Sequence, residues 1–189
     1  MLKKRGFAFL IVALVPVLCV LIAEMSYAQI RQETIQNPET ARDYFERALV
    51  YQGAGDFENA VADYTHALVL EPDHATTYYN RGLAHASMGE HHKAVDDYSH
   101  AIKLDPEYAK AYADRGISFS KLGDKQKAMA DYNAAIRIAP DYPNAYCNRG
   151  AYYANSGDME NASRDARKAC ELGNCTLLRD MRRRGELIE

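Results

Sequence analysis

The strongest constraint on the fold is an internal repeat, which starts again at Ala41, Ala75, Ala109 and Pro143. Set in rows that begin at these residues, the sequence keeps one register. Place 4 of the rows is Tyr44, Tyr78, Tyr112 and Tyr146, place 8 is Ala48, Gly82, Gly116 and Gly150, and place 20 is alanine throughout. A fixed period of this length indicates one structural unit that is copied along the chain.

The pattern within a row predicts two helices that pack closely. Small residues at places 8, 20 and 27 let the helices approach, and large residues at places 4 and 24 fill the space beside them. A glycine at place 15 forms the turn, and the Asp or Glu that follows it suits the positive start of the second helix. Proline at place 32 of the first three rows ends the hairpin, because a helix does not continue normally through it.

This register resembles the tetratricopeptide repeat, which has a large residue at place 4, small residues at 8, 20 and 27, aromatic residues at 11 and 24, and proline at 32. The resemblance implies an all-α fold, a right-handed α-solenoid of four helical hairpins at residues 41–74, 75–108, 109–142 and 143–176. Residues 29–40 are then a linker and helix lead-in, and residues 177–189 a capping helix and tail.

The chain departs from the family pattern at place 4, which is tyrosine instead of the tryptophan often found there, and at place 7, which is arginine instead of an apolar residue. Place 7 is arginine and place 23 is aspartate in every row: Arg47, Arg81, Arg115 and Arg149, with Asp63, Asp97, Asp131 and Asp165. We expect an arginine–aspartate ladder, in which each arginine meets the aspartate of its own row or that of the preceding row, so that the pairs Asp63–Arg81, Asp97–Arg115 and Asp131–Arg149 recur at one 18-residue interval. The alternative is two solvated charge stripes that never meet, since exposed ion pairs contribute only about 0 to 1 kcal/mol.

Residues 1–28 are predicted to be a secretory signal peptide. Basic residues 3–5 precede an apolar run from Phe7 to Ala23, and Ser26 and Ala28 occupy the −3 and −1 positions of a small-residue cleavage site. The alternative is an uncleaved inner-membrane anchor, because the apolar run as a helix would span roughly 26 Å, the lower limit for crossing a bilayer. Either way the segment contacts the membrane during export and the rest of the chain lies outside the cytoplasm, which favours a periplasmic bacterial protein.

The charge of the chain does not point to nucleic acid. The net charge is −3, and the arginines near the C-terminus, Arg179, Arg182, Arg183 and Arg184, alternate with Leu177, Leu178 and Met181 at helical spacing. We interpret this segment as a solvated cap on the last repeat, because terminal repeats need a polar outer face and no basic or aromatic stripe continues elsewhere.

Six histidines fall between residues 66 and 100: His66, His74, His85, His91, His92 and His100. Imidazole is a good ligand for zinc, nickel or copper, so a metal-binding module is one hypothesis. Because no two of these histidines have the i, i+4 spacing of ligands on one helix face, we interpret them as surface residues and expect no metal and no cofactor.

Cys147, Cys170 and Cys175 remain if residues 1–28 are removed. Cys170 and Cys175 flank Gly173 at the end of the last repeat, so an exported chain could close a small disulfide there. Buried free thiols are the alternative.

The resemblance implies that the first helices of the repeats line a concave groove that takes an extended peptide or a partner helix. Carried over to this chain, the groove residues are Arg42, Phe45, Leu49, Tyr79, Asn80, Leu83, Lys110, Ala113, Ile117, Asn144, Cys147 and Asn148. Some family members hold the C-terminal carboxylate of chaperones with lysine, asparagine and arginine. Asp114 puts a negative charge where that clamp needs an arginine, and Phe45 and Leu49 replace its first pair, which disfavours chaperone tails.

We expect a non-catalytic interaction scaffold whose partner is another protein of unknown identity. No nucleophile elbow, phosphate-binding glycine loop or zinc-protease helix occurs in the sequence, so an enzyme is disfavoured. Two alternatives stay open: a structural protein whose repeats stack between chains as a homo-oligomer, and the metal-binding module described above.

Overall fold

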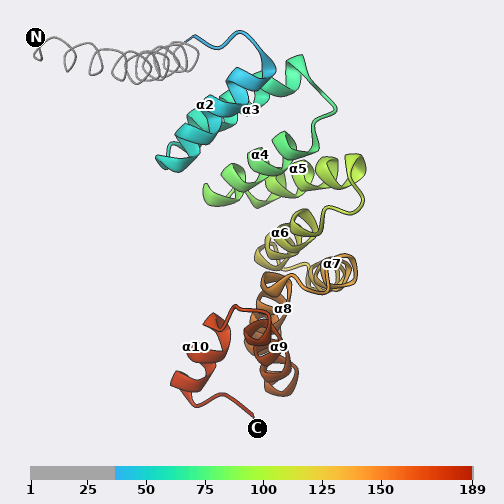
Figure 1. Ribbon diagram of the computed structural model, residues 1–189. Helices are drawn as coiled ribbons and strands as arrows, with labels where there is room; N and C mark the ends of the chain where they lie inside the picture. Colours follow the sequence, from blue (N-terminus) through green and yellow to red (C-terminus); the bar gives the residue numbers. More distant parts are fainter. Residues whose placement is uncertain (1–36, 189) are drawn as a thin grey trace, which may run out of the picture.

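The computed structural model describes residues 37–188, and all regular secondary structure in this range is helical (Figure 1). The helices are α2 (Ala41–Gly53), α3 (Phe57–Leu70), α4 (Ala75–Ser87), α5 (His91–Leu104), α6 (Ala109–Lys121), α7 (Lys125–Ile138), α8 (Pro143–Asn155), α9 (Met159–Glu171) and α10 (Thr176–Arg184). The all-α prediction is confirmed.

The helices pack as consecutive pairs, α2 with α3, α4 with α5, α6 with α7 and α8 with α9. The second helix of each pair contacts the first helix of the next, and α6 touches both α4 and α8, so the pairs form one elongated stack (Figure 1). Helix α10 closes the stack by packing against α8 and α9, which is the capping position that the sequence predicted.

Each hairpin turn is built by the residues expected from its sequence. The turn glycines lie in the left-handed region, for example Gly89 with φ of +78°, where a side chain is disfavoured. Asp56, Asp124 and Asp158 then cap α3, α7 and α9 by accepting a hydrogen bond from a backbone N–H three positions on. Glu90 makes no such cap, because its carboxylate instead pairs with His85 and Lys93.

Small residues and tyrosines make the core of each pair. A Cβ on Gly116 would lie 2.7 Å from the ring of Tyr132, so glycine at place 8 is what lets the tyrosine of place 24 enter between the helices. Tyr98 is buried against Gly82 in the same way, whereas in the first repeat Tyr64 is buried beside Ala48. In the last pair, where place 24 is alanine, Leu177 of α10 takes the position of the missing ring and would lie 2.7 Å from a Cβ on Gly150.

Every arginine of place 7 binds the aspartate of its own repeat, in the following helix. Arg115 donates through Nε and Nη2 to the two oxygens of Asp131, at 2.8 Å each, and the other three repeats have the same bidentate pair. The structure therefore has the pairing within a repeat, and the expected pairs at an 18-residue interval, such as Asp97 with Arg115, are wrong: there the arginine meets place 25 of the preceding repeat instead of its aspartate. All four aspartates are buried and the arginines are largely buried, unlike solvated charge stripes.

The same arginines also connect successive repeats. Nη1 of Arg81, Arg115 and Arg149 donates to Thr65, Ser99 and Asn133, which all occupy place 25 of the preceding repeat. Each guanidinium also lies over the ring of the tyrosine of place 4, at 5.5 to 5.9 Å from its centroid. Three contacts thus explain why tyrosine, arginine and glycine recur together in the rows. The arginine lies over the tyrosine ring, the same arginine binds the aspartate of its repeat, and the glycine leaves space for the side chain that packs between the helices.

No helix between residues 37 and 188 is long and apolar enough to cross a membrane. The predicted signal peptide, residues 1–28, and most of the predicted linker lie outside the described residues.

Candidate functional site

The predicted groove residues lie on the first helices of the pairs, and several of them gather in two cavities. Arg42, Phe45 and Leu49 of α2 line a cavity of about 590 Å³ together with Glu71 and His74. The ring of His74 meets Phe45 edge-on at 5.7 Å, which makes one wall of this cavity aromatic. The cavity is large enough for a side chain or a short segment of a partner.

The first helices of the pairs, α2, α4, α6 and α8, form one face of the stack, which we call the inner face. A second cavity of about 380 Å³ lies at its C-terminal end. The predicted residues Ile117, Asn144, Cys147 and Asn148 line it from α6 and α8. Residues that were not among the predicted ones also line it: Asp114 from α6, Tyr142 from the loop before α8, and Asn174, Thr176, Leu177 and Asp180 from the cap and the loop before it. The capping helix is therefore part of the wall of the groove.

The remaining predicted groove residues lie on α4 and α6. Tyr79 packs against Tyr98 and Tyr108, with ring centroids 5.9 and 4.9 Å away, and Asn80 donates to the Thr76 carbonyl. Leu83 is half-buried, and Lys110 lies near enough to Asp114 to act on its charge. One carried-over residue is wrong: Ala113 is fully buried in the core with Ala135 and Ala145, so its side chain does not reach the groove.

Asp114 of α6 is an acidic side chain on this face that lines the second cavity. Tyr79 of α4 donates a hydrogen bond of 2.8 Å to its Oδ2 across the interface between α4 and α6. Burial raises the pKa of Asp114 above its ordinary value, while the Tyr79 hydrogen bond and the Lys110 charge act in the opposite direction. Burial, with the Asp114 charge second, also raises the pKa of Tyr79, so the hydroxyl stays protonated and the carboxylate keeps its donor.

An aromatic row that was not predicted from the sequence lies beside Asp114. Place 34, the last residue of a row, is His74, Tyr108 and Tyr142, and each lies against place 5 of its own repeat: Phe45, Tyr79 and Ala113. Burial raises the pKa of Tyr108 and Tyr142, and the nearby Asp114 charge adds to this. This aromatic row could have been predicted from the sequence, because its three residues recur at the same place of successive rows.

The interpretation of the histidines as surface residues is wrong for His85. Its side chain is only 10% exposed; Nδ1 lies 2.6 Å from Glu90 and Nε2 lies 3.9 Å from Asp97 of the ladder. His85 occupies place 11, where the other rows have Tyr51, Phe119 and Tyr153, so it fills an aromatic position of the core. His100 stacks on Tyr78, and His66 packs on Tyr44 with its ring tilted by 30°. Within residues 37–188 no group of three His, Cys, Asp or Glu side chains could hold a metal ion.

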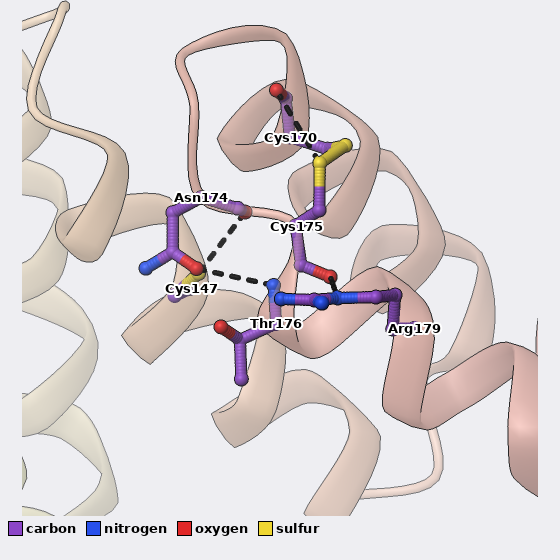
Figure 2. The surroundings of a disulfide bond; sticks show 6 residues. All are labelled: Cys147, Cys170, Asn174, Cys175, Thr176 and Arg179. Atoms are coloured by element: carbon purple, nitrogen blue, oxygen red, sulfur yellow. Dashed lines mark hydrogen bonds between the residues drawn. A yellow bond between two sulfur atoms is a disulfide. The ribbon is translucent and has the colours of Figure 1, made fainter.

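The structure joins Cys170 and Cys175 by a disulfide, which ties the end of α9 to the start of α10 (Figure 2). Cys147 is a free thiol that is half-buried, and burial raises its pKa. Figure 2 shows Cys147 beside Asn174, whose side chain accepts from the Thr176 N–H at the start of α10. The bridge thus fixes the segment that forms one wall of the second cavity.

Family models of one kind of repeat match the sequence of this chain. Models described as "Tetratricopeptide repeat" match residues 75–108 and 143–172, and one described as "TPR repeat" matches residues 48–89 and 118–157. Together they reach from α2 to the end of α9. No curated protein is similar enough in sequence to match the chain.

Several solved structures have the same arrangement of helices. A crystal structure of MamA is similar with a TM-score of 0.67 and 26% identity, and the match covers 75% of this chain and 84% of that one. The first TPR of Spaghetti (RPAP3), bound to the HSP90 peptide SRMEEVD, has a TM-score of 0.55 and 25% identity over 56% of this chain and 84% of that one. The second TPR domain of human RPAP3, in complex with the HSP70 peptide SGPTIEEVD, has a TM-score of 0.54 and 27% identity over 56% and 88%.

Proposed function

The chain is a tetratricopeptide-repeat protein, and from this premise we propose that it is a non-catalytic scaffold that binds an extended peptide or a helix of another protein along its inner face. The observation that carries the proposal is the pair of cavities on the first helices, which are lined by most of the predicted groove residues. Domains of similar structure have been solved with peptides bound.

The proposed binding face combines apolar and polar groups in the way that reversible peptide binding needs. Phe45, Leu49, Leu83 and Ile117 offer apolar surface, and the amides of Asn144 and Asn148 can pair with the backbone of a partner. We expect a dissociation constant in the micromolar range, about −8 kcal/mol, as is usual for modular adaptors.

We also infer that the protein acts outside the cytoplasm, in the periplasm of a bacterium. The support is the layout of residues 1–28, in which a basic start, an apolar run and a small-residue cleavage site follow one another. The disulfide between Cys170 and Cys175 agrees with an oxidising compartment. N-terminal sequencing of the purified protein tests this inference, because cleavage predicts a chain that begins at Gln29.

A pair of matched substitutions tests the binding face. Ile117→Arg puts a charge into the second cavity, whereas Val69→Arg makes the same kind of change on α3 at a side chain that is 75% exposed and lines neither cavity. The full chain and both variants are used to capture partners from an envelope extract under native conditions. Circular dichroism first shows that the two variants keep the helical content of the natural chain.

The proposal predicts a protein that the natural chain and Val69→Arg retain and that Ile117→Arg loses. A partner retained by Ile117→Arg and lost by Val69→Arg would move the binding surface to the second helices. A mass that rises with protein concentration, with no other protein captured, would support assembly between copies of the chain.

A further inference from the structure

Asp114 carries a negative charge that the described part of the chain leaves without a direct ion pair. Its Oδ2 accepts from the Tyr79 hydroxyl, and no hydrogen bond to Oδ1 and no lysine or arginine nitrogen within 4 Å is found among residues 37–188. Asp114 is half-buried, and a carboxylate that is partly withdrawn from water without such a partner is costly. Every aspartate of the ladder, by contrast, has its arginine. Asp114 is therefore a candidate binding group on the inner face.

The cavity beside Asp114 has the opposite charge to a basic ligand. Two carboxylates, Asp114 and Asp180, face it together with the amides of Asn144 and Asn148, and no lysine or arginine of the described residues lines it. Asp180 already has a partner in Arg183, at 3.6 Å on the exposed side of α10. Asp114 is therefore the carboxylate that a ligand in this cavity would neutralise.

An aromatic wall favours the same class of ligand. Tyr142 lines the cavity and lies close enough to Asp114 for that charge to raise the Tyr142 pKa further than burial alone. A guanidinium or ammonium group over a tyrosine ring is attracted by the ring face, and arginine adds stacking and hydrogen bonds to a carboxylate. Tyr79 does not line the cavity and acts as a positioning residue, because its hydroxyl holds Oδ2 and directs the carboxylate.

We propose that the cavity between α6 and α8 receives one basic side chain, arginine or lysine, of the bound partner, with Asp114 as its counter-charge. This inference rests on the proposed function and specifies its partner. The peptides in the two RPAP3 structures, SRMEEVD and SGPTIEEVD, end in acidic residues. The groove of this chain would select the opposite charge at this position.

Peptide selection with the full chain tests the inference. Random peptides of about twelve residues, displayed on phage, are selected on the immobilised protein, and the selected peptides are then synthesised. Each is titrated in two forms, one natural and one in which an arginine is replaced by citrulline, or a lysine by norleucine; both replacements remove the charge and keep the carbon chain. Asp114→Asn and the cavity control Asp180→Asn are titrated with the same pairs.

We expect one recurrent basic position, whose replacement weakens binding to the natural chain by about tenfold or more, as for hydrogen bonds to a charged group. The replacement should cost less than about twofold in Asp114→Asn, whose amide can still accept from Tyr79, and should keep its full effect in Asp180→Asn. The citrulline and norleucine pairs on the natural chain decide the question even where a variant does not fold.

One outcome would overturn this inference and leave the proposed function standing: the selected peptides bind the natural chain, do not bind Ile117→Arg, and share no basic position. Peptides that bind the natural chain and Ile117→Arg equally, or a selection that yields no binder, would overturn both.

Discussion

Arg115 and Asp131 form a two-point ion pair inside one hairpin, with Nε and Nη2 of the arginine each 2.8 Å from a carboxylate oxygen. The third nitrogen of Arg115 donates to Ser99 of the preceding repeat at 3.0 Å. One side chain therefore holds the two helices of a repeat together and attaches that repeat to its neighbour. The equivalent arrangement at Arg81 and Arg149 makes it a property of the whole stack.

Replacing Arg115 by leucine is expected to lower the free energy of unfolding by about 3 kcal/mol, because Asp131 is left buried without its partner. Adding Asp131→Asn should recover part of this loss, since no unpaired charge then remains. The control is Arg164→Leu, whose pair with Glu160 is exposed and whose loss should cost no more than about 0.5 kcal/mol. Urea unfolding of the four proteins measures these values, and an Arg115→Leu chain as stable as the control would contradict the ladder.

Gly116→Leu is expected to destabilise the chain by about 3 kcal/mol, because its Cβ alone would lie 2.7 Å from the Tyr132 ring and 3.2 Å from the Ala128 carbonyl oxygen. Gly53→Leu is the matched control, since Gly53 ends α2 and a Cβ there has no atom within 4 Å. Thermal unfolding of both variants compares them directly. Equal transition temperatures would show that the tyrosine does not need the space at place 8.

Met181→Ala is expected to cost about 2 to 4 kcal/mol, because Met181 is fully buried between the cap and the last repeat. Arg183→Ala, on the exposed side of the same helix, should change the stability by less than about 0.5 kcal/mol. If hydrogen exchange shows that α9 keeps its protection in Met181→Ala, then α10 is not the cap that this packing describes.

Thiol titration of the denatured chain tests the disulfide. Reduction before the titration should expose the thiols of Cys170 and Cys175 in addition to that of Cys147, which reacts in both cases. The bridge closes a short loop, for which the chain-entropy model gives about 2 kcal/mol of stabilisation. An unchanged thiol count would contradict the bridge.

Asp114→Asn is expected to raise the stability of the unbound chain at neutral pH. Burial raises the pKa of Asp114 above its ordinary value of 3.8, so the folded chain binds the proton more tightly than the unfolded chain. The stability of the natural chain therefore falls as the pH rises through the window between these two pKa values, and the asparagine variant lacks that loss. Its advantage should be small at about pH 4 or below and complete at about pH 7. Asp141→Asn, an exposed control, should show no such trend.

A less stable Asp114→Asn chain at neutral pH would mean that the Tyr79 hydrogen bond outweighs the burial of the charge. The predicted outcome is instead a variant that gains stability and loses its preference for basic peptides, which is typical of a binding group that is kept at a cost to the fold.

The fold could be predicted from the sequence because its period places the same few residues at the same places in each row. Small residues, turn glycines and prolines each carry a local physical reason, and their spacing leaves few alternatives to a stack of helical hairpins. The partner of each ladder arginine was less certain, because the register is compatible both with Asp131 and with Asp97 of the preceding row as the partner of Arg115. Only the packing of the two helices distinguishes them.

The centre of the groove was harder to predict, because it depends on burial. In the sequence Asp114 is one acidic residue where a clamp would need an arginine, and nothing local shows that Tyr79, in the preceding row, donates to it. His85 was predicted wrongly for a different reason: the spacing of the histidines as a group says nothing of burial, whereas the register of the rows places His85 at an aromatic core position.

Crosslinking from the groove in living cells tests whether a partner protein binds the inner face. A photoreactive benzoylphenylalanine is introduced at position 117, in the second cavity, and separately at position 69, which is exposed on α3. We expect a discrete crosslinked protein from position 117 that is absent from position 69. A crosslink from position 69 with none from position 117 would contradict the claim that the inner face is the binding surface.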